Sequence, residues 1–310
     1  MSNAYIFPGQ GAQFVGMGHD LYETFPVARK LLDEAETVTG IPLRHLCFEG
    51  PMDQLSDTAV SQPALVACSI AALEVAREMG IPKPAYVLGL SLGEYAALYA
   101  AGVLSSADAV GLVRQRGLAM KEAGAANPGT MTSVLGAEDA VIRDIVARAA
   151  EKGVINVANF NCPGQVVLSG AVPAIEFAEQ LLSAVPRVRA IRLSVSGAFH
   201  SPLMKPAADK LALALERVEW HPPQVPVIQN VTGEAVGSVP EIKLNLVAQL
   251  TGSVQFEKSV NRAKQLGVDR LFELGPGKVL AGLVRRIDRN LPVINVGTAT
   301  EAESLRSVAH

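Results

Sequence analysis

The chain has 310 residues, of which 49% are hydrophobic and 18% charged, with a formal net charge of −3. This length and composition indicate a globular protein with a large core and exclude a disordered or fibrous chain. There is no global basic field and no lysine- and arginine-rich run interleaved with aromatic residues, so we expect no nucleic-acid partner.

Three widely spaced cysteines, Cys47, Cys68 and Cys162, form no metal-ligand pattern. A sparse, odd set is typical of a reducing compartment. The N-terminal sequence lacks the charged and apolar regions of a signal peptide. We also predict that no apolar stretch reaches the about 18 residues needed to span a membrane. We therefore expect a cytoplasmic protein with no membrane partner.

Strands and helices are predicted to alternate along the first 126 residues. The expected strands are 4–7 and 85–89, and the expected helices are 25–39, 62–79 (capped by Ser61), 92–101 and 107–121. Such alternation is typical of a parallel sheet with helices on its faces.

The middle of the chain follows a different order. Strands are expected at 131–135, 154–158, 165–169 and 189–195, with helices at 138–152 and 173–183 and a connecting loop at 159–164. This β-α-β-β-α-β order is that of the ferredoxin-like unit. We predict that residues 127–196 form a small ferredoxin-like domain inserted into a large α/β domain of residues 1–126 and 197–310.

The large domain is expected to resume after the insertion. A helix at 204–216, strands at 225–230, 270–274 and 292–296, and a turn at 275–277 leading into a helix through residue 286 are predicted. The fold class is therefore α/β, with a large α/β-hydrolase-like domain containing a parallel sheet.

Gly89-Leu90-Ser91-Leu92-Gly93 matches the nucleophile-elbow pattern G-x-S-x-G. A predicted strand precedes it and a predicted helix follows it, which is the context that an elbow requires. The alternative is that Ser91 merely caps a helix; the strand–elbow–helix context favours a nucleophile.

A serine nucleophile needs a base, and the chain has five histidines: His19, His45, His200, His221 and His310. His200 is the best candidate, because it lies just after a predicted strand and just before a helix, where α/β sheets present functional loops. Taken singly, each of these histidines is more typical of a structural role.

Four segments occur in the order found in malonyl-CoA:acyl-carrier-protein transacylases. They are Phe7-Pro8-Gly9-Gln10-Gly11-Ala12-Gln13, Gly89-Leu90-Ser91-Leu92-Gly93-Glu94, Arg114-Gln115-Arg116-Gly117 and Gly197-Ala198-Phe199-His200-Ser201. The chain resembles this family essentially from end to end. Many members have histidine where Leu90 stands, and we expect this departure to alter local packing rather than the chemistry.

The resemblance implies a role for each matching position. Ser91 is the nucleophile and His200 its general base, while the main-chain carbonyl of Gln249 orients the imidazole. The backbone N–H groups of Gln10 and Leu92 form the oxyanion hole, and Arg116 binds the malonyl carboxylate. The remaining pocket positions implied are Gln62, Asn159, Gln165 and Phe199. Without the resemblance, Arg116 reads more simply as a charge on the surface of a helix.

The implied activity is S-malonyltransfer from malonyl-CoA to the phosphopantetheine thiol of an acyl carrier protein by a ping-pong mechanism, supplying fatty acid biosynthesis. No cofactor or metal is expected, since the substrates carry the phosphopantetheine, and we expect a monomer. A stand-alone acyltransferase serving a polyketide synthase is an alternative, and a serine thioesterase or hydrolase a weaker one. A non-catalytic scaffold is disfavoured by the intact Ser91, His200 and Arg116.

Overall fold

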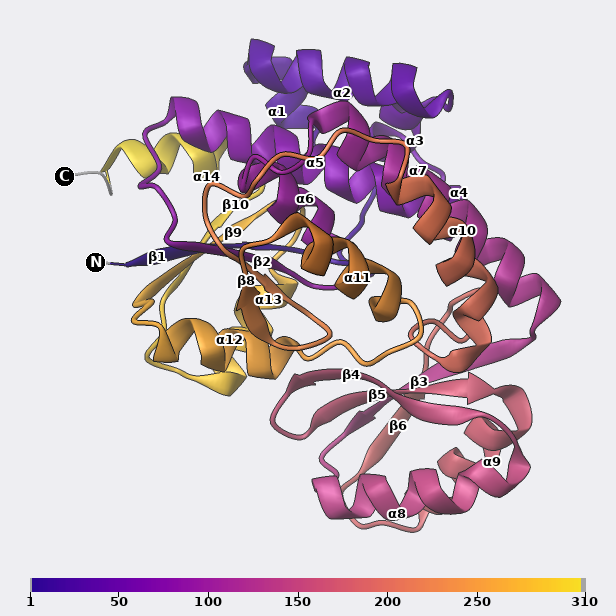
Figure 1. The fold of residues 1–310 in the computed structure, drawn as a ribbon. Coiled ribbons are helices and arrows are strands. Elements are labelled where there is room, and N and C mark those ends of the chain that lie inside the picture. Colours follow the sequence, from indigo (N-terminus) through magenta and orange to yellow (C-terminus); the bar gives the residue numbers. More distant parts are fainter. Residues whose placement is uncertain (1, 308–310) are drawn as a thin grey trace.

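A computed structural model describes residues 2–307 of the chain, which contain two separate sheets. The larger sheet and most helices form one layered body, and the smaller sheet with two helices lies beside it (Figure 1). This architecture confirms the predicted α/β class with a second, ferredoxin-like unit. The domain boundaries at residues 126/127 and 196/197 stay a prediction.

The large sheet has six strands, five of them parallel. In spatial order they are β10 (Val293–Val296), β9 (Arg270–Leu274), β1 (Asn3–Phe7), β2 (Tyr86–Gly89), β7 (Val227–Gln229) and β8 (Glu234–Val236). The pairs from β10 to β7 are parallel, whereas the edge strand β8 is antiparallel to β7. The short β8 was not predicted from the sequence.

The two faces of this sheet are buried by different helices. In β1, Tyr5 and Phe7 join one apolar cluster while Ala4 and Ile6 join another, as the two-residue period of a strand requires. The apolar cluster on the first face also contains side chains of the helices α1 (His19–Thr24), α2 (Pro26–Thr39), α3 (Leu43–Phe48), α4 (Met52–Leu55), α5 (Thr58–Glu78), α6 (Gly93–Ala100), α7 (Ser106–Ala126), α10 (Lys205–Leu215), α11 (Val239–Gln249) and α14 (Ala299–Ser304). The second face is covered by α12 (Phe256–Gln265) and α13 (Val279–Ile287).

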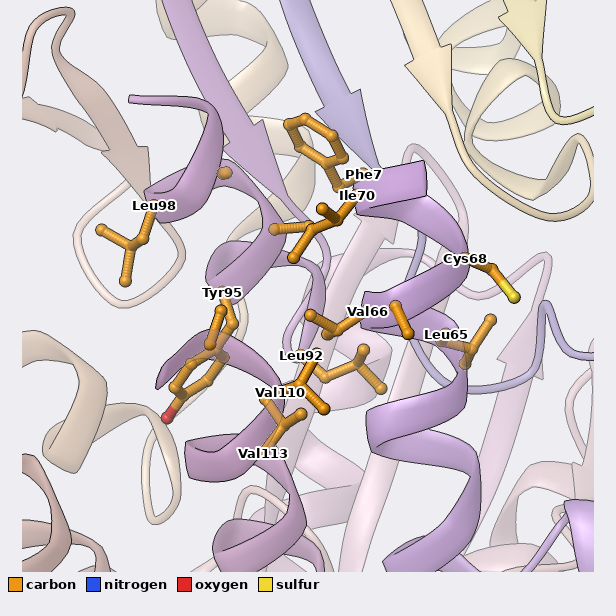
Figure 2. Packing of buried hydrophobic residues seen from close by; sticks show 14 of the residues in the cluster. Phe7, Leu65, Val66, Cys68, Ile70, Leu92, Tyr95, Leu98, Val110 and Val113 are labelled. Atoms are coloured by element: carbon orange, nitrogen blue, oxygen red, sulfur yellow. The ribbon is translucent and has the colours of Figure 1, made fainter. Parts of the chain in front are cut away.

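Helix α5 is the centre of the core. Figure 2 shows Leu65, Val66 and Ile70 of α5 packed among side chains of β1, α6 and α7. Our prediction that no segment could span a membrane was wrong by length and composition, because Thr58–Glu78 is long and apolar enough. However, 89% of its apolar window is buried inside the protein, where the surrounding helices replace water.

The predicted start of this helix at residue 62 with Ser61 as its cap was also wrong. The helix begins at Thr58, and the cap is Asp57, whose carboxylate accepts from the Ala59 amide. Pro63 therefore lies inside the helix, where it cannot donate to the Ala59 carbonyl. Arg114 of α7 donates to that carbonyl instead, at 2.6 Å, so a tertiary hydrogen bond permits the earlier start.

The small sheet is antiparallel, with the spatial order β4 (Ile155–Cys162), β5 (Gln165–Ala171), β3 (Gly129–Leu135) and β6 (Arg189–Arg192). Helices α8 (Asp139–Ala149) and α9 (Val172–Ser183) cover one face, and the 3-10 turn Ala150–Lys152 extends α8. The expected loop at 159–164 was too long: β4 continues to Cys162, because its second half pairs both with β5 and with Val254 of the large body.

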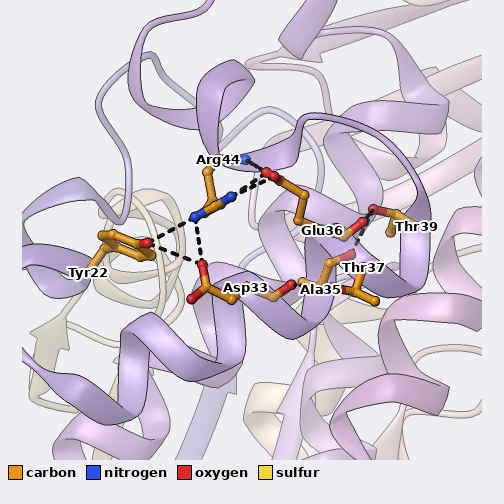
Figure 3. Close-up of polar contacts among 7 residues, drawn as sticks. All are labelled: Tyr22, Asp33, Ala35, Glu36, Thr37, Thr39 and Arg44. Carbon is orange, nitrogen blue, oxygen red and sulfur yellow. Dashed lines mark hydrogen bonds and ion pairs between the residues drawn. The ribbon is translucent and has the colours of Figure 1, made fainter.

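The α1–α3 corner was not predicted. Figure 3 shows how Arg44 closes it: its guanidinium donates to Asp33, Glu36 and the Tyr22 hydroxyl. The contacts with Asp33 and Glu36 are both 2.7 Å. Two short 3-10 turns, Pro202–Met204 and Leu305–Ser307, complete the described elements.

Candidate active site

Ser91 lies at a sharp elbow between β2 and α6. Its backbone is left-handed, with φ 51°, a conformation that costs energy for a residue with a Cβ. Glycines flank it by necessity: a Cβ on Gly89 would lie 2.0 Å from the Gly93 carbonyl carbon, and one on Gly93 would lie 2.2 Å from the Phe7 oxygen. The turn therefore depends on both glycines. The Leu90 side chain packs half-buried against the second apolar cluster.

Asn230, just after β7, fixes this elbow from below. Its Oδ1 accepts from the Ser91 amide and its Nδ2 donates to the Gly89 carbonyl, both at 2.6 Å. Because one partner can only donate and the other can only accept, the direction of the Asn230 amide is determined. Asn230 was missed in the sequence, where its position at the carboxyl end of a central parallel strand was the available signal.

His200 faces the serine. Its Nε2 is 2.8 Å from the Ser91 Oγ, and its Nδ1 is 2.8 Å from the main-chain oxygen of Gln249. A carbonyl oxygen only accepts, so Nδ1 carries the proton and the Nε2 lone pair faces the serine hydroxyl. Burial, followed by the positive charge of Arg116, lowers the pKa of His200 to about 4, although the Gln249 carbonyl opposes this. The ring is therefore neutral at pH 7.

Arg116 of α7 lies beside this pair and is only 1% exposed, which excludes the surface-charge interpretation. Its Nη1 donates to Gln62 Oε1 at 2.7 Å, and its Nη2 donates to Gln249 Oε1 at 2.9 Å and to Ser91 Oγ at 3.1 Å. All three acceptors are neutral, and within residues 2–307 Arg116 makes no ion pair. Desolvation lowers its pKa. A buried cation held only by neutral oxygens favours an incoming anion.

The two predicted oxyanion amides lie in loops that meet at the elbow. The Leu90 amide donates to the Phe7 carbonyl at 3.0 Å, which brings the loop after β1 against the serine. Gln10 in that loop accepts from the Thr58 hydroxyl through its side chain at 2.8 Å. Across residues 2–307, neither the Gln10 nor the Leu92 amide has an intramolecular acceptor, which leaves both N–H groups available.

The remaining predicted positions divide into two groups. Gln62 contacts Arg116, and Phe199 is buried next to His200. Asn159 and Gln165 form no hydrogen bond with Ser91, His200 or Arg116; Gln165 instead accepts from Arg286 at 2.8 Å. Their place in the pocket stays a prediction.

The other histidines lie elsewhere. His19 stacks on Phe48, His45 is 3.5 Å from Glu49, and His221 is 3.8 Å from Glu219. His310 falls outside the described residues. All three cysteines are free and buried. Within residues 2–307 no group of three or more histidine, cysteine, aspartate or glutamate side chains is arranged to hold a metal ion.

The sequence of this chain is similar to acyl transferases over nearly its whole length. Residues 4–304 match the family model described as the acyl transferase domain. A malonyl CoA-acyl carrier protein transacylase of Bacillus subtilis (strain 168) is 46% identical over 294 residues, covering 94% of this chain and 92% of that protein. The protein of the same name from Escherichia coli (strain K12) is 43% identical over 284 residues, covering 92% of each chain.

Solved structures agree with these sequence matches. The acyl-carrier-protein S-malonyltransferase of Bartonella henselae has a TM-score of 0.96 and 41% identity, covering 100% of this chain and 99% of that one. A malonyl-transacylase solved in complex with a type II PKS acyl-carrier protein has a TM-score of 0.95 and 39% identity, covering 99% and 100%. The matched regions therefore include both sheets and the segments that carry the site.

Proposed function

This chain belongs to the acyl transferase family and, within it, to the malonyl-CoA:acyl-carrier-protein transacylases, and we propose from that premise that it moves malonyl groups through a covalent ester on Ser91. The donor is malonyl-CoA and the acceptor is the phosphopantetheine thiol of an acyl carrier protein. One observation carries the proposal: the Ser91 hydroxyl lies between a neutral imidazole and a buried arginine that forms no direct ion pair within the described residues.

In the first half-reaction, His200 Nε2 takes the hydroxyl proton as Ser91 Oγ attacks the thioester carbonyl carbon. The carbonyl oxygen becomes an oxyanion, for which the Gln10 and Leu92 amides are the available donors. When this intermediate collapses, the C–S bond breaks and the imidazolium returns its proton to the leaving CoA sulfur. The products are CoA and malonyl-Ser91.

The second half-reaction runs in the opposite direction. The thiol of the carrier's phosphopantetheine gives its proton to His200 Nε2 and attacks the ester carbon, and the released Ser91 oxygen recovers the proton. The Nδ1 bond to the Gln249 carbonyl stabilises the imidazolium that forms in both halves. The cycle uses only groups of this chain and its substrates, so we propose that it needs no cofactor.

Arg116 selects the acyl group in this proposal. Its planar fork can donate two parallel hydrogen bonds to a carboxylate, and its present bonds to neutral oxygens are weaker than those it would make with a charged one. An acyl group without a carboxylate would leave the cation without a direct ion-pair partner, so discrimination should be strong.

Transfer to a carrier must be separated from hydrolysis, which shares the same acyl-enzyme. Enzyme incubated with malonyl-CoA and a phosphopantetheinylated carrier protein should yield malonyl-carrier faster than free malonate, and Ser91→Ala should yield neither product above background. Release of malonate alone in the presence of carrier would identify a hydrolase.

The biological setting is part of the proposal. We propose that the carrier serves fatty acid biosynthesis; a polyketide synthase carrier is the alternative, suggested by the relative solved with such a partner. Comparing kcat/KM for carriers of each type distinguishes the two. We also propose a cytoplasmic monomer, which gel filtration and cell fractionation would test.

A further inference from the structure

A buried carboxylate lies directly beneath the site. Glu94 is in the first turn of α6, three residues after the nucleophile, and is 1% exposed. Its Oε1 accepts from the Asn230 main-chain amide, and its Oε2 accepts from the Gln249 side-chain Nε2 at 2.6 Å. The catalytic steps proposed above do not use it.

We propose that Glu94 is a positioning residue for malonyl selection: its ionised carboxylate fixes the direction of the Gln249 side-chain amide, and that amide holds Arg116 beside Ser91. This inference rests on the proposed function, because it assigns to Glu94 the correct placement of the carboxylate-binding arginine.

The direction of an amide is decided by its neighbours. An ionised carboxylate can only accept, so Gln249 turns its NH2 group toward Glu94 and its oxygen toward Arg116. The Ser91 carbonyl, which accepts from the same Nε2 at 3.2 Å, favours the same direction. The Gln249 Oε1 is then the acceptor for Arg116 Nη2 at 2.9 Å. Glu94 is therefore linked to the arginine through one intervening amide.

Glu94→Gln would break this arrangement while keeping the shape of the side chain. The Asn230 main-chain N–H can only donate, so the new amide must point its oxygen there and its NH2 toward Gln249. Gln249 would then face one donor at residue 94 and another at Arg116. No direction of the Gln249 amide satisfies residue 94, Arg116 and the Ser91 carbonyl together, so the arginine loses a defined acceptor.

If Glu94 acted only through its charge, its replacement by glutamine would raise the selectivity for malonyl-CoA instead of lowering it. Glu94 interacts with Arg116 through its charge, so neutralising it would make the site more positive and would strengthen the binding of a malonyl carboxylate. The direction of the change in selectivity therefore separates positioning from charge.

The test compares Ser91 acylation by malonyl-CoA and acetyl-CoA in the wild type, Glu94→Gln, Gln249→Met and the double variant. Methionine keeps the length of the side chain and the main-chain carbonyl that His200 needs, but removes the amide. Burial raises the pKa of Glu94 to about 8, against its hydrogen bonds and the Arg116 charge. The assay is therefore run near pH 9, where the carboxylate is ionised (about 90% of molecules one unit above the pKa).

We expect Glu94→Gln to lower kcat/KM for malonyl-CoA about ten- to hundredfold, the range for losing a charge-assisted contact, and to change acetyl-CoA only a few-fold. Gln249→Met should show the same bias, and the double variant should be no worse than the more impaired single variant. Equal losses for both substrates, a gain in malonyl selectivity, or losses that multiply in the double variant would overturn the proposal.

Folding is checked by thermal melting of each variant. If Glu94→Gln does not fold, Gln249→Met decides, since an unchanged malonyl-to-acetyl ratio there would overturn the proposal. A wild type that is not acylated by malonyl-CoA would instead contradict the proposed function itself, so the two failures are distinguishable.

Discussion

Ser91 and His200 both have left-handed backbones, with φ 51° and 57°, and their side chains meet at 2.8 Å. Two non-glycine residues in this region each carry a local cost of about 1–3 kcal/mol. The surrounding hydrogen bonds offset it: Asn230 holds the backbone of Ser91, and Asn156 of the small sheet donates to the His200 carbonyl at 2.8 Å. The reactive pair is thus set by groups from both sheets.

Replacing Arg116 should change selectivity rather than abolish chemistry. We expect Arg116→Ala to reduce kcat/KM for malonyl-CoA by about a hundredfold or more, because a charged contact is lost, while acetyl-CoA holds or improves. Arg116→Lys should be intermediate, since it keeps the charge but not the fork. Arg114→Ala is the matched control: it lies on the same helix, bonds the Ala59 carbonyl and should lower Tm without altering the ratio. Equal losses for both acyl groups in Arg116→Ala would mean that Arg116 does not bind the carboxylate.

The decrease in acylation rate on acidification should occur at an unusually low pH. His200 must be neutral to accept the proton, and its pKa is depressed to about 4. Acylation by acetyl-CoA, which depends little on Glu94, should therefore be nearly constant from pH 8 down to about 6 and fall to half near pH 4. Brief pH-jump measurements with acetyl-CoA would show this; a midpoint near the 6.5 of an exposed histidine would contradict it.

The same shift links His200 to stability. In the unfolded chain this histidine is protonated below about pH 6.5, whereas in the folded chain it is protonated only near pH 4. The free energy of unfolding therefore decreases as the pH falls through that window. The full shift corresponds to on the order of 3 kcal/mol. Denaturant unfolding at pH 7 and pH 5 should show a smaller pH-dependent loss in His200→Ala than in the wild type. An identical pH dependence in the two proteins would exclude this contribution.

Asn156 should affect rate without affecting selectivity. Asn156→Ala removes the donor to the His200 carbonyl, and we expect acylation by malonyl-CoA and acetyl-CoA to slow about five- to tenfold together. Single-turnover acylation measures both. A change in the malonyl-to-acetyl ratio would show that Asn156 affects the position of Arg116 rather than that of His200.

Phe199 should limit the size of the acyl group. It is buried beside His200, and Phe199→Ser would open space there. We expect methylmalonyl-CoA to gain relative to malonyl-CoA in direct competition assays. An unchanged preference would remove Phe199 from the specificity determinants.

Local sequence signals located the elements that carry chemistry. The strand before Gly89, the elbow and the β-α-β-β-α-β order follow from apolar periodicity and glycine placement, because those patterns are set by nearest neighbours. The start of α5 does not, since the Pro63 inside it is accommodated by Arg114 from another helix. The extension of β4 likewise depends on pairing with Val254, which lies far along the chain.

The site shows the same division. Ser91 and His200 lie in loops with recognisable sequence patterns. The burial of Arg116 could not be predicted, because the polar and apolar residues of its helix are not separated onto distinct faces. Asn230 is a single polar residue just after β7 and Asn156 one within β4, and only the folded chain shows that they hold the reactive backbones. Tertiary contacts, not local pattern, decide those roles.

The most direct measurement is to map the acyl group after mixing enzyme with malonyl-CoA and quenching in acid. Peptide mass spectrometry should find one malonyl group, on the peptide containing Ser91, and its loss after adding the phosphopantetheinylated carrier. A malonyl group on another residue, or transfer to the carrier by Ser91→Ala at the wild-type rate, would contradict the account.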